Sequence, residues 1–75
     1  MEERLDGVRL GCWRRVTQIQ GEETLVRRLG DFGLLPGTLV RPEYRSPGNH
    51  GTVITFRGTQ LALRTKDLGK IRVML

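Results

Sequence analysis

Side chains capable of binding a metal are sparse in this 75-residue chain. Cys12 and His50 are the only soft ligands besides the thioethers of Met1 and Met74. A structural zinc site needs about four ligands and a catalytic one about three, and no HxxxH, CxxC or HxxE spacing supplies them. A single histidine in a Gly-rich loop is typical of a solvated surface. The sequence therefore predicts no native metal site and no cofactor.

Catalytic arrangements are also missing from the sequence. There is no second histidine, no serine or cysteine with a base at a readable spacing, and no Gly-rich phosphate loop with a lysine. Gly30 and Gly33 are explained by close helix packing and by a glycine at a helix end. We therefore predict a protein that binds a partner, with no enzyme activity and no catalytic residues.

Basic residues are the remaining group that could bind a partner. Thirteen Lys and Arg against eight Asp and Glu give a net charge of +5. This balance suits nucleic acid, anionic lipid or an acidic protein face, although surplus arginine can equally keep a small domain soluble. Arg27 and Arg28, with Arg41 and Arg45, form the best candidate contact patch. The alternative for the first pair is helical pairing of Glu23 with Arg27, worth only about 0.2–0.5 kcal/mol.

Length and cysteine content restrict the class of protein. Residues 1–75 suffice for one domain with one thin core. The single Cys12 cannot form an internal disulfide, which fits a reducing compartment. The start at Met1 is acidic where an export signal needs Lys or Arg, and no apolar run approaches the roughly 20 residues of a spanning helix. We expect a soluble cytoplasmic protein without membrane insertion.

Ten glycines separate short segments of strand length, a pattern typical of a small barrel or sandwich. The predicted strands are residues 12–20, 39–45, 52–56, 59–64 and 71–73. Leu5 and Val8 precede them in an extended lead-in that covers one end of the core. Val16 and Ile19 lie three apart, so a bulge must turn both inward. Pro42 cannot donate to a ladder, so its strand is at an edge, bulged or short.

One segment, residues 22–32, follows a helical pattern instead. Three apolar residues at i, i+4 and i+7 share one face of this helix: Leu25, Leu29 and Phe32. Thr24 is a candidate N-cap, and Gly33 is placed to end the helix in the left-handed conformation. We expect this helix between the first and second strands, with its apolar face on the core.

A defined turn follows the helix. Pro36 sets φ at the second turn position, and Gly37 supplies the positive φ that a type II turn needs at the third. Leu34 should cover the core, whereas Leu35 is expected at the surface, where a fixed turn presents an apolar anchor at little entropic cost. The predicted partner-binding residues are Arg27, Arg28, Leu34, Leu35, Pro36, Arg41 and Arg45. Trp13 is assigned to the core rather than to the binding surface.

The last third of the chain predicts a hairpin around Arg57-Gly58 and a closing strand. The arms of the hairpin turn four apolar residues inward: Ile54, Phe56, Leu61 and Leu63. Thr65 caps a short helical turn, and Ile71 and Val73 then alternate with basic residues. The predicted fold is mainly β: a five-stranded barrel with one helix between strands one and two and a helical turn before the last strand.

The run from Arg27 to Gly37 resembles the signature of the bacterial ferrous iron transport protein A (FeoA) family. That signature has two basic residues, Leu, an acidic residue, an apolar residue, Gly-Leu, any residue and Pro-Gly. Residues 58–64, followed by Ile71 and Val73, match the family's second landmark. The opening pattern is matched by Leu5, Val8, Gly11, Val16, Ile19 and Gly21. The resemblance spans nearly the whole chain, and its two landmarks keep their normal separation.

This resemblance implies an SH3-like barrel, in agreement with the fold predicted from periodicity and turns. It also implies a small cytosolic protein that assists the membrane ferrous iron transporter (FeoB), whose cytosolic part is a GTPase. The same domain type occurs at the carboxyl end of iron-dependent repressors. The chain departs from the family pattern at Pro42, at residues 48–51 and at Trp13-Arg14.

Three functional hypotheses follow. The first is an accessory or regulatory protein of bacterial ferrous iron transport that binds the GTPase part of the transporter. The second is a small basic barrel that binds nucleic acid or acts as a regulator-type interaction domain; four aromatic residues, at least one of them needed in the core, leave few stacking platforms for nucleic acid. The third, compatible with either, is a homo-oligomer joined at an edge strand that contains Pro42.

Overall fold

The computed structural model describes residues 1–48 and 50–75 with their side chains. Its six strands are β1 (Glu2–Arg4), β2 (Arg14–Ile19), β3 (Leu39–Arg45), β4 (Gly51–Phe56), β5 (Thr59–Arg64) and β6 (Ile71–Met74). Its helical elements are η1 (Leu5–Gly7), α1 (Glu23–Asp31), η2 (Pro47–Asn49) and α2 (Thr65–Leu68). None of the helices in the described part has the length and apolar character needed to cross a membrane.

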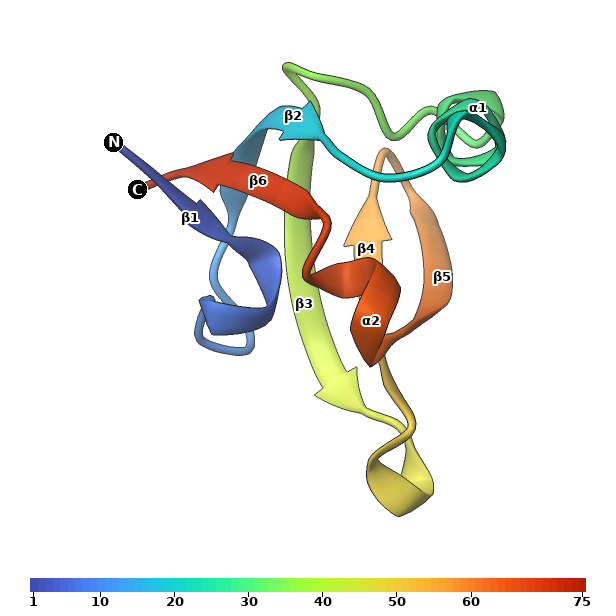
Figure 1. Cartoon of the computed structure of the whole chain (residues 1–75). Coiled ribbons are helices and arrows are strands. Elements are labelled where there is room, and N and C mark those ends of the chain that lie inside the picture. Colours follow the sequence, from blue (N-terminus) through green and yellow to red (C-terminus); the bar gives the residue numbers. More distant parts are fainter.

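The strands form one antiparallel sheet in the order β1-β6-β2-β3-β4-β5. The long β3 joins two halves, with β1, β6 and β2 on one side and β4 and β5 on the other (Figure 1). The two termini lie side by side, where the amide of Leu75 donates to the carbonyl of Met1 at 3.0 Å. The sheet curls around the space that the core fills.

The prediction of a mainly β fold is confirmed, but the count of five strands was wrong. Glu2–Arg4 adds a sixth strand, because it pairs with β6 through Glu3 opposite Val73. A short polar strand of this kind carries no apolar alternation, so its pairing depends on a neighbour from the other end of the chain. The last strand, predicted to close the barrel, does not close it completely, since β1 and β5 remain as the two edges of the sheet.

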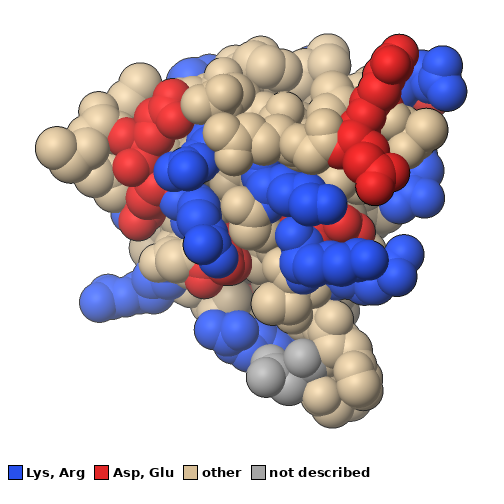
Figure 2. All heavy atoms as spheres, viewed as in Figure 1, with Lys and Arg blue, Asp and Glu red and all other residues tan. Residues whose placement is uncertain are grey.

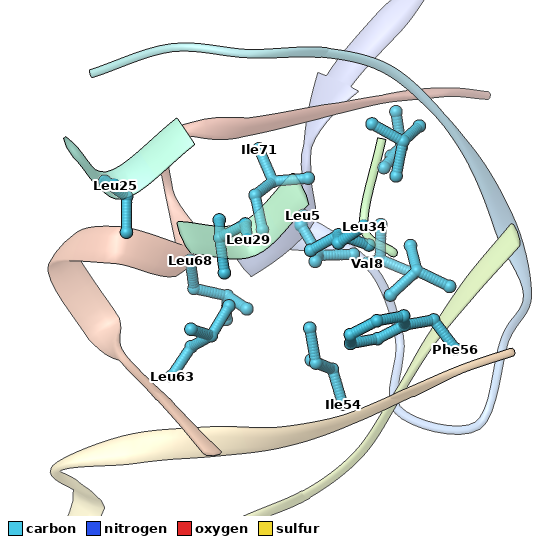
Figure 3. Packing of buried hydrophobic residues seen from close by; sticks show 13 residues of the cluster. Leu5, Val8, Leu25, Leu29, Leu34, Ile54, Phe56, Leu63, Leu68 and Ile71 are labelled. Carbon is cyan, nitrogen blue, oxygen red and sulfur yellow. The ribbon is translucent and has the colours of Figure 1, made fainter. Parts of the chain in front are cut away.

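The core is one cluster of thirteen buried apolar residues (Figure 3). Phe56 is the largest of the fully buried side chains, and Leu5 from η1 is fully buried in the same cluster. The helix α1 supplies Leu25 and Leu29, and α2 supplies Leu68. The predicted extended lead-in is a short strand followed by a 3₁₀ turn at Leu5–Gly7. It covers the core through Leu5 and Val8, as predicted.

The ends of α1 differ from the prediction in two ways. The N-cap is Glu22, so the assignment of Thr24 was wrong, and no side chain caps the helix start. Phe32 was also wrongly placed in the core: it is the C-cap and is 49% exposed. The helical period ends with the helix, so Leu34 takes the inward position instead and is fully buried.

The exit from α1 is a complete Schellman motif. The amide of Leu34 donates to the carbonyl of Leu29 at 2.9 Å, and the amide of Gly33 donates to the carbonyl of Gly30 at 2.9 Å. Gly33 has φ +99°, which confirms the left-handed helix end that the sequence predicted. A second cap was predicted wrongly: Thr65 is the first residue of α2, and its N-cap is Arg64.

Two irregularities in the strands were predicted from the sequence. The β2–β6 register shifts between Val16 and Gln18, which confirms the predicted bulge. The β3–β4 register shifts between Pro42 and Tyr44, so the bulge is the correct one of the three alternatives for Pro42. Because β3 pairs with β2 on one side and β4 on the other, the predicted edge strand for a homo-oligomer was wrong.

The predicted hairpin is confirmed as β4 and β5, with β4 beginning one residue early at Gly51. Three of its four inward residues are buried, and Leu61 is partly buried against the core. Ile71 and Val73 in β6 are fully buried, as the alternation predicts. The hairpin tip lies beside the exit of α1, and this neighbourhood forms the site described next.

Candidate functional site

An open groove of about 890 Å³ lies between two tight turns at one end of the barrel. The turn after α1 forms one wall, the tip of the β4–β5 hairpin forms the other, and the starts of β2 and β3 form the floor. We call it the turn groove. Its main lining side chains are Trp13, Arg15, Leu35, Pro36, Leu39 and Arg57.

The apolar side chains of the turn groove are unusually accessible. Trp13 is 44% exposed, Leu35 48% and Leu39 44%. Single exposed apolar residues are ordinary on a protein surface, but three that line one groove form a contiguous patch of the kind that marks an interaction site. Two arginines stand beside this patch, Arg15 on β2 and Arg57 in the hairpin turn.

The first wall is a type II turn, as the sequence predicted. The amide of Thr38 donates to the carbonyl of Leu35 at 3.0 Å, and Gly37 has φ +97°. The buried Thr38 hydroxyl accepts from the amide of Leu35 at 3.3 Å and donates to the carbonyl of Gly33 at 3.1 Å. The turn is thereby tied to the end of α1.

The same turn is also tied to β2. The amide of Gly37 donates to the carbonyl of Val16 at 2.7 Å, and the amide of Val16 donates to the carbonyl of Thr38 at 2.9 Å. Arg15 Nη1 donates to the carbonyl of Gly37 at 2.7 Å, which holds its guanidinium at the groove. Leu35 lies against α1, where a Cβ added at Gly30 would meet its Cδ2 at 3.2 Å. Leu35 is therefore presented by a rigid support.

The second wall is the hairpin turn Arg57-Gly58. Their φ angles of 49° and 76° are those of a type I′ turn, for which Asn-Gly is the favoured pair. Arg57 is the only non-glycine residue in the described part of the chain with positive φ. Its stem packs near Gly33, where an added Cβ would meet Arg57 Cδ at 3.4 Å. An arginine is thus held at the groove in a strained backbone conformation.

Relief of this strain is a testable consequence. Replacing Arg57 with asparagine is expected to raise the free energy of unfolding by about 1 kcal/mol, because asparagine tolerates the left-handed region far better. Arg57→Lys keeps a strained long side chain and should leave stability unchanged. Urea unfolding of the three proteins measures the difference. A loss of stability in Arg57→Asn alone would show that the packing of the arginine stem outweighs the strain.

Trp13 was wrongly assigned to the core. In β3 the side chains of Val40 and Pro42 point inward and are buried, so Leu39 and Arg41 face outward, on the side where Trp13 lies. The guanidinium carbon of Arg41 lies 4.8 Å from the centre of the indole ring, a cation–π contact. Arg41 Nη2 also donates to Glu43 Oε2 at 2.8 Å.

That hydrogen bond affects the Glu43 carboxyl directly. The Arg41 side chain lowers the pKa of Glu43 below its ordinary value, mainly through this hydrogen bond. Arg41 therefore contacts Glu43 through this hydrogen bond and Trp13 through the cation–π contact. The Arg41 guanidinium thus lies over the indole of Trp13, which lines the groove.

The predicted partner-binding residues are only partly brought together. Leu35 and Pro36 line the turn groove, and Arg41 reaches its border through Trp13. Leu34 is fully buried, so it can support the groove but cannot contact a partner. The remaining three lie outside the lining: Arg27, Arg28 and Arg45.

Four of the six main lining side chains were missed from the sequence: Trp13, Arg15, Leu39 and Arg57. Leu39 carried a usable signal, because Val40 must point inward and its neighbours in the strand must then point outward. The other three line one groove only because the folded sheet brings residues 13–15 and the β4–β5 turn to the same end of the molecule. No local pattern marks that proximity.

A metal centre is not formed by the residues that the structure describes. No three of their His, Cys, Asp and Glu side chains gather closely enough to hold an ion. Cys12 is half-buried and packs against the core. The sequence-based expectation of no native metal site stays a prediction.

Comparison with known proteins settles the family. The model of the FeoA domain family matches residues 4–75. This chain belongs to the FeoA family. A search among curated proteins finds no match. The resemblance seen in the sequence is confirmed, and with it a link to ferrous iron transport as one of a family of small accessory domains.

Solved structures support the same assignment. FeoA from Chlorobium tepidum is 26% identical, with a TM-score of 0.87 over 93% of this chain and 67% of that one. FeoA from Stenotrophomonas maltophilia, complexed with zinc and described as a prokaryotic SH3 domain protein, is 23% identical, with a TM-score of 0.81 over 95% of this chain and 88% of that one. The FeoA chain therefore has an SH3-like fold.

A third solved structure extends the fold beyond transport proteins. A manganese-dependent transcriptional repressor is 16% identical, with a TM-score of 0.84 over 96% of this chain and 40% of that one. At that identity the likeness concerns the fold alone. The FeoA fold thus also occurs as one part of larger chains.

Proposed function

We propose that this FeoA chain is a cytoplasmic accessory or regulatory protein of bacterial ferrous iron transport, and that residues 1–75 act as one domain. Its partner is the cytosolic GTPase part of the membrane iron transporter, and the turn groove is the docking surface. The observation that carries the proposal is the exposed apolar patch held between two rigid turns. The S. maltophilia relative supports it, since that protein is described as a candidate activating factor of bacterial ferrous iron transport.

The construction of the groove suits protein binding. Tryptophan and arginine are the residue types that most often dominate the binding energy of an interface, and the groove holds Trp13, Arg15 and Arg57. The turn that carries Leu35 is fixed by hydrogen bonds on both sides. Little conformational entropy is therefore lost when a partner covers it, which favours affinity.

The charge of the groove indicates what the partner segment presents. Arg15 stands on the side of β2 and Arg57 on the side of the hairpin, with apolar side chains between them. An apolar side chain flanked by carboxylates complements this pattern, because the carboxylates can pair with the two guanidinium groups. We expect the segment of the transporter that docks here to have that composition.

The nucleic-acid alternative depends on the exposed aromatic residues. One of the four aromatic residues, Phe56, is in the core, as the sequence predicted, so three remain as possible stacking platforms. Trp13, Phe32 and Tyr44 are exposed. Binding to single-stranded DNA or RNA would therefore rest on stacking and would weaken steeply with salt. Saturable binding to nucleic acid, together with no binding to the transporter, would contradict the proposed function.

A charge placed in the groove tests the docking surface. Leu35→Glu is expected to weaken binding to the purified cytosolic GTPase part of the transporter by about 30-fold, the loss typical of a central interface residue. Leu10→Glu is the matched control, since Leu10 is 41% exposed but does not line the groove. Isothermal titration calorimetry measures both variants, and circular dichroism confirms that they are folded.

The outcome also separates the two candidate surfaces. Loss of binding in Leu35→Glu with normal binding in Leu10→Glu supports the groove. If both leucine variants bind normally and a variant with the charges of Arg27 and Arg28 reversed does not, the docking surface includes these two arginines of α1 instead of the groove. Absence of binding by the native chain would contradict the choice of partner.

A further inference from the structure

A second hollow, of about 260 Å³, lies where α1 begins and α2 packs beside it. It shares no lining residue with the turn groove. Four cationic side chains line it: Arg28, Arg64, Lys66 and Lys70. Figure 2 shows Lys and Arg side chains spread across the middle of the molecular face on which α2 lies. We call this hollow the cationic hollow.

The positive charge of the cationic hollow is not balanced within the protein. Glu22 and Asp67 also line it, so four cations and two carboxylates leave a formal surplus of two positive charges. Lys70 Nζ lies 3.8 Å from Asp67 Oδ1, which is the only ion pair among the described residues that involves the lining. Asp67 is buried and committed to Lys70, whereas Glu22 is exposed.

The cations come from separate elements that the fold holds together. Arg28 lies on α1, Arg64 ends β5, and Lys66 lies on α2. Like charges repel, so their convergence costs free energy unless an anion joins them. Their arrangement is not a solvated stripe along one helix, because three elements contribute to it.

Lys70 packs over the backbone at Gly21. Gly21 has φ +113°, and a Cβ added there would lie only 2.8 Å from Lys70 Cδ. The stem of the lysine therefore crosses a position that only glycine leaves open. The carbonyl of Lys70 also accepts from the amide of Gln20 at 2.7 Å. The stem of Lys70 thus lies against Gly21, and its side chain lines the hollow.

We propose that the cationic hollow binds a phosphate group, an activity separate from the docking function of the turn groove. Guanidinium groups bind phosphate oxygens in a bidentate manner, and lysine adds point charges around them. A hollow of this size admits a phosphate or diphosphate rather than a whole nucleotide, since sites for drug-sized ligands begin at about 300 Å³. The phosphate comes either from a small free compound or from the headgroup of an anionic phospholipid.

Two probes and a pair of charge-matched variants test this site. The full chain is titrated with inorganic pyrophosphate, followed by the amide NMR signals of residues 64–70, and is sedimented with vesicles of equal parts phosphatidylcholine and phosphatidic acid. The site variant is Arg64→Glu with Lys66→Glu. The control is Arg9→Glu with Arg27→Glu, which makes the same change in net charge at exposed residues outside the hollow.

We expect the native chain to bind at least one probe, the site variant to bind it at least about tenfold more weakly, and the control to change less than about twofold. Pyrophosphate binding alone assigns a free phosphate compound, and vesicle binding that falls in the same variant assigns a lipid headgroup. Equal weakening in both variants, or no binding of either probe by the native chain, overturns the proposal. If charge reversal prevents folding, Arg28→Gln with Lys66→Gln gives the same readout.

Discussion

Replacing Gly51 with alanine is expected to lower the free energy of unfolding by about 3 kcal/mol, which is a large part of the stability of so small a domain. Gly51 is buried at the start of β4 and pairs with Arg64 of β5. A Cβ at this position would meet the carbonyl oxygen of Leu63 well inside the closest approach that real Cβ atoms make. The clashing atom belongs to the backbone, so it cannot rotate away as a side chain would.

The clash spreads through the hairpin. Moving the carbonyl of Leu63 disturbs the β4–β5 ladder along which Thr52 pairs with Leu63. The carbonyl of Gly51 also accepts hydrogen bonds from the amide of Ser46 at 2.9 Å and from its hydroxyl at 3.2 Å. Relaxation on either side therefore breaks existing hydrogen bonds.

Gly7→Ala provides the control for this prediction. Gly7 has no heavy atom within 4 Å of an added Cβ, and its φ is not positive, so stability should stay within about 0.5 kcal/mol of the native chain. Urea unfolding monitored by circular dichroism compares the three proteins. Equal midpoints for Gly51→Ala and the native chain would mean that β5 does not pass over Gly51 as the structure has it.

The role of Gly51 also shows where sequence reasoning stops. The sequence places Gly51 in a loop of residues 46–51, because the neighbouring Pro, Gly and Asn residues all favour turns. The strands that it does predict, such as Leu39–Arg45 and the two arms of the hairpin, follow from side-chain alternation between turn residues. These signals are local. The contact with Leu63 comes from a residue twelve positions away and leaves no mark in the loop.

The residues of the turn groove also divide into some that the sequence predicts and some that it does not. The turn that presents Leu35 is predictable, because proline and glycine fix its backbone from within four residues. Trp13 and Arg57 are not predictable, because only the folded sheet brings the start of β2 and the hairpin turn to the same groove. The four cations of the second hollow are likewise spread from Arg28 to Lys70 along the chain. Surfaces built from several elements can therefore be found only in the folded structure.

Two phenylalanines give the largest contrast expected in this protein. Phe56→Ala should lower the free energy of unfolding by about 3–5 kcal/mol, because it removes the largest fully buried side chain and leaves a cavity among packed neighbours. Figure 3 shows its ring inside the cluster, close to Ile54. Phe32→Ala, by contrast, should cost about 0.5 kcal/mol or less, because half of that side chain already faces water.

Comparing these two variants shows whether helical periodicity or the packing of the folded chain decides which phenylalanine is buried. A helical period places Phe32 on the core face with Leu25 and Leu29, whereas the Schellman exit gives that inward position to Leu34. Urea unfolding by circular dichroism measures both variants, and Leu34→Ala should resemble Phe56→Ala in its large loss. If Phe32→Ala proved as damaging as Phe56→Ala, the ring of Phe32 would have to lie in the core, and the cap at Gly33 would be wrong. Since that cap also sets the direction of Leu35, the turn groove would then lose its support.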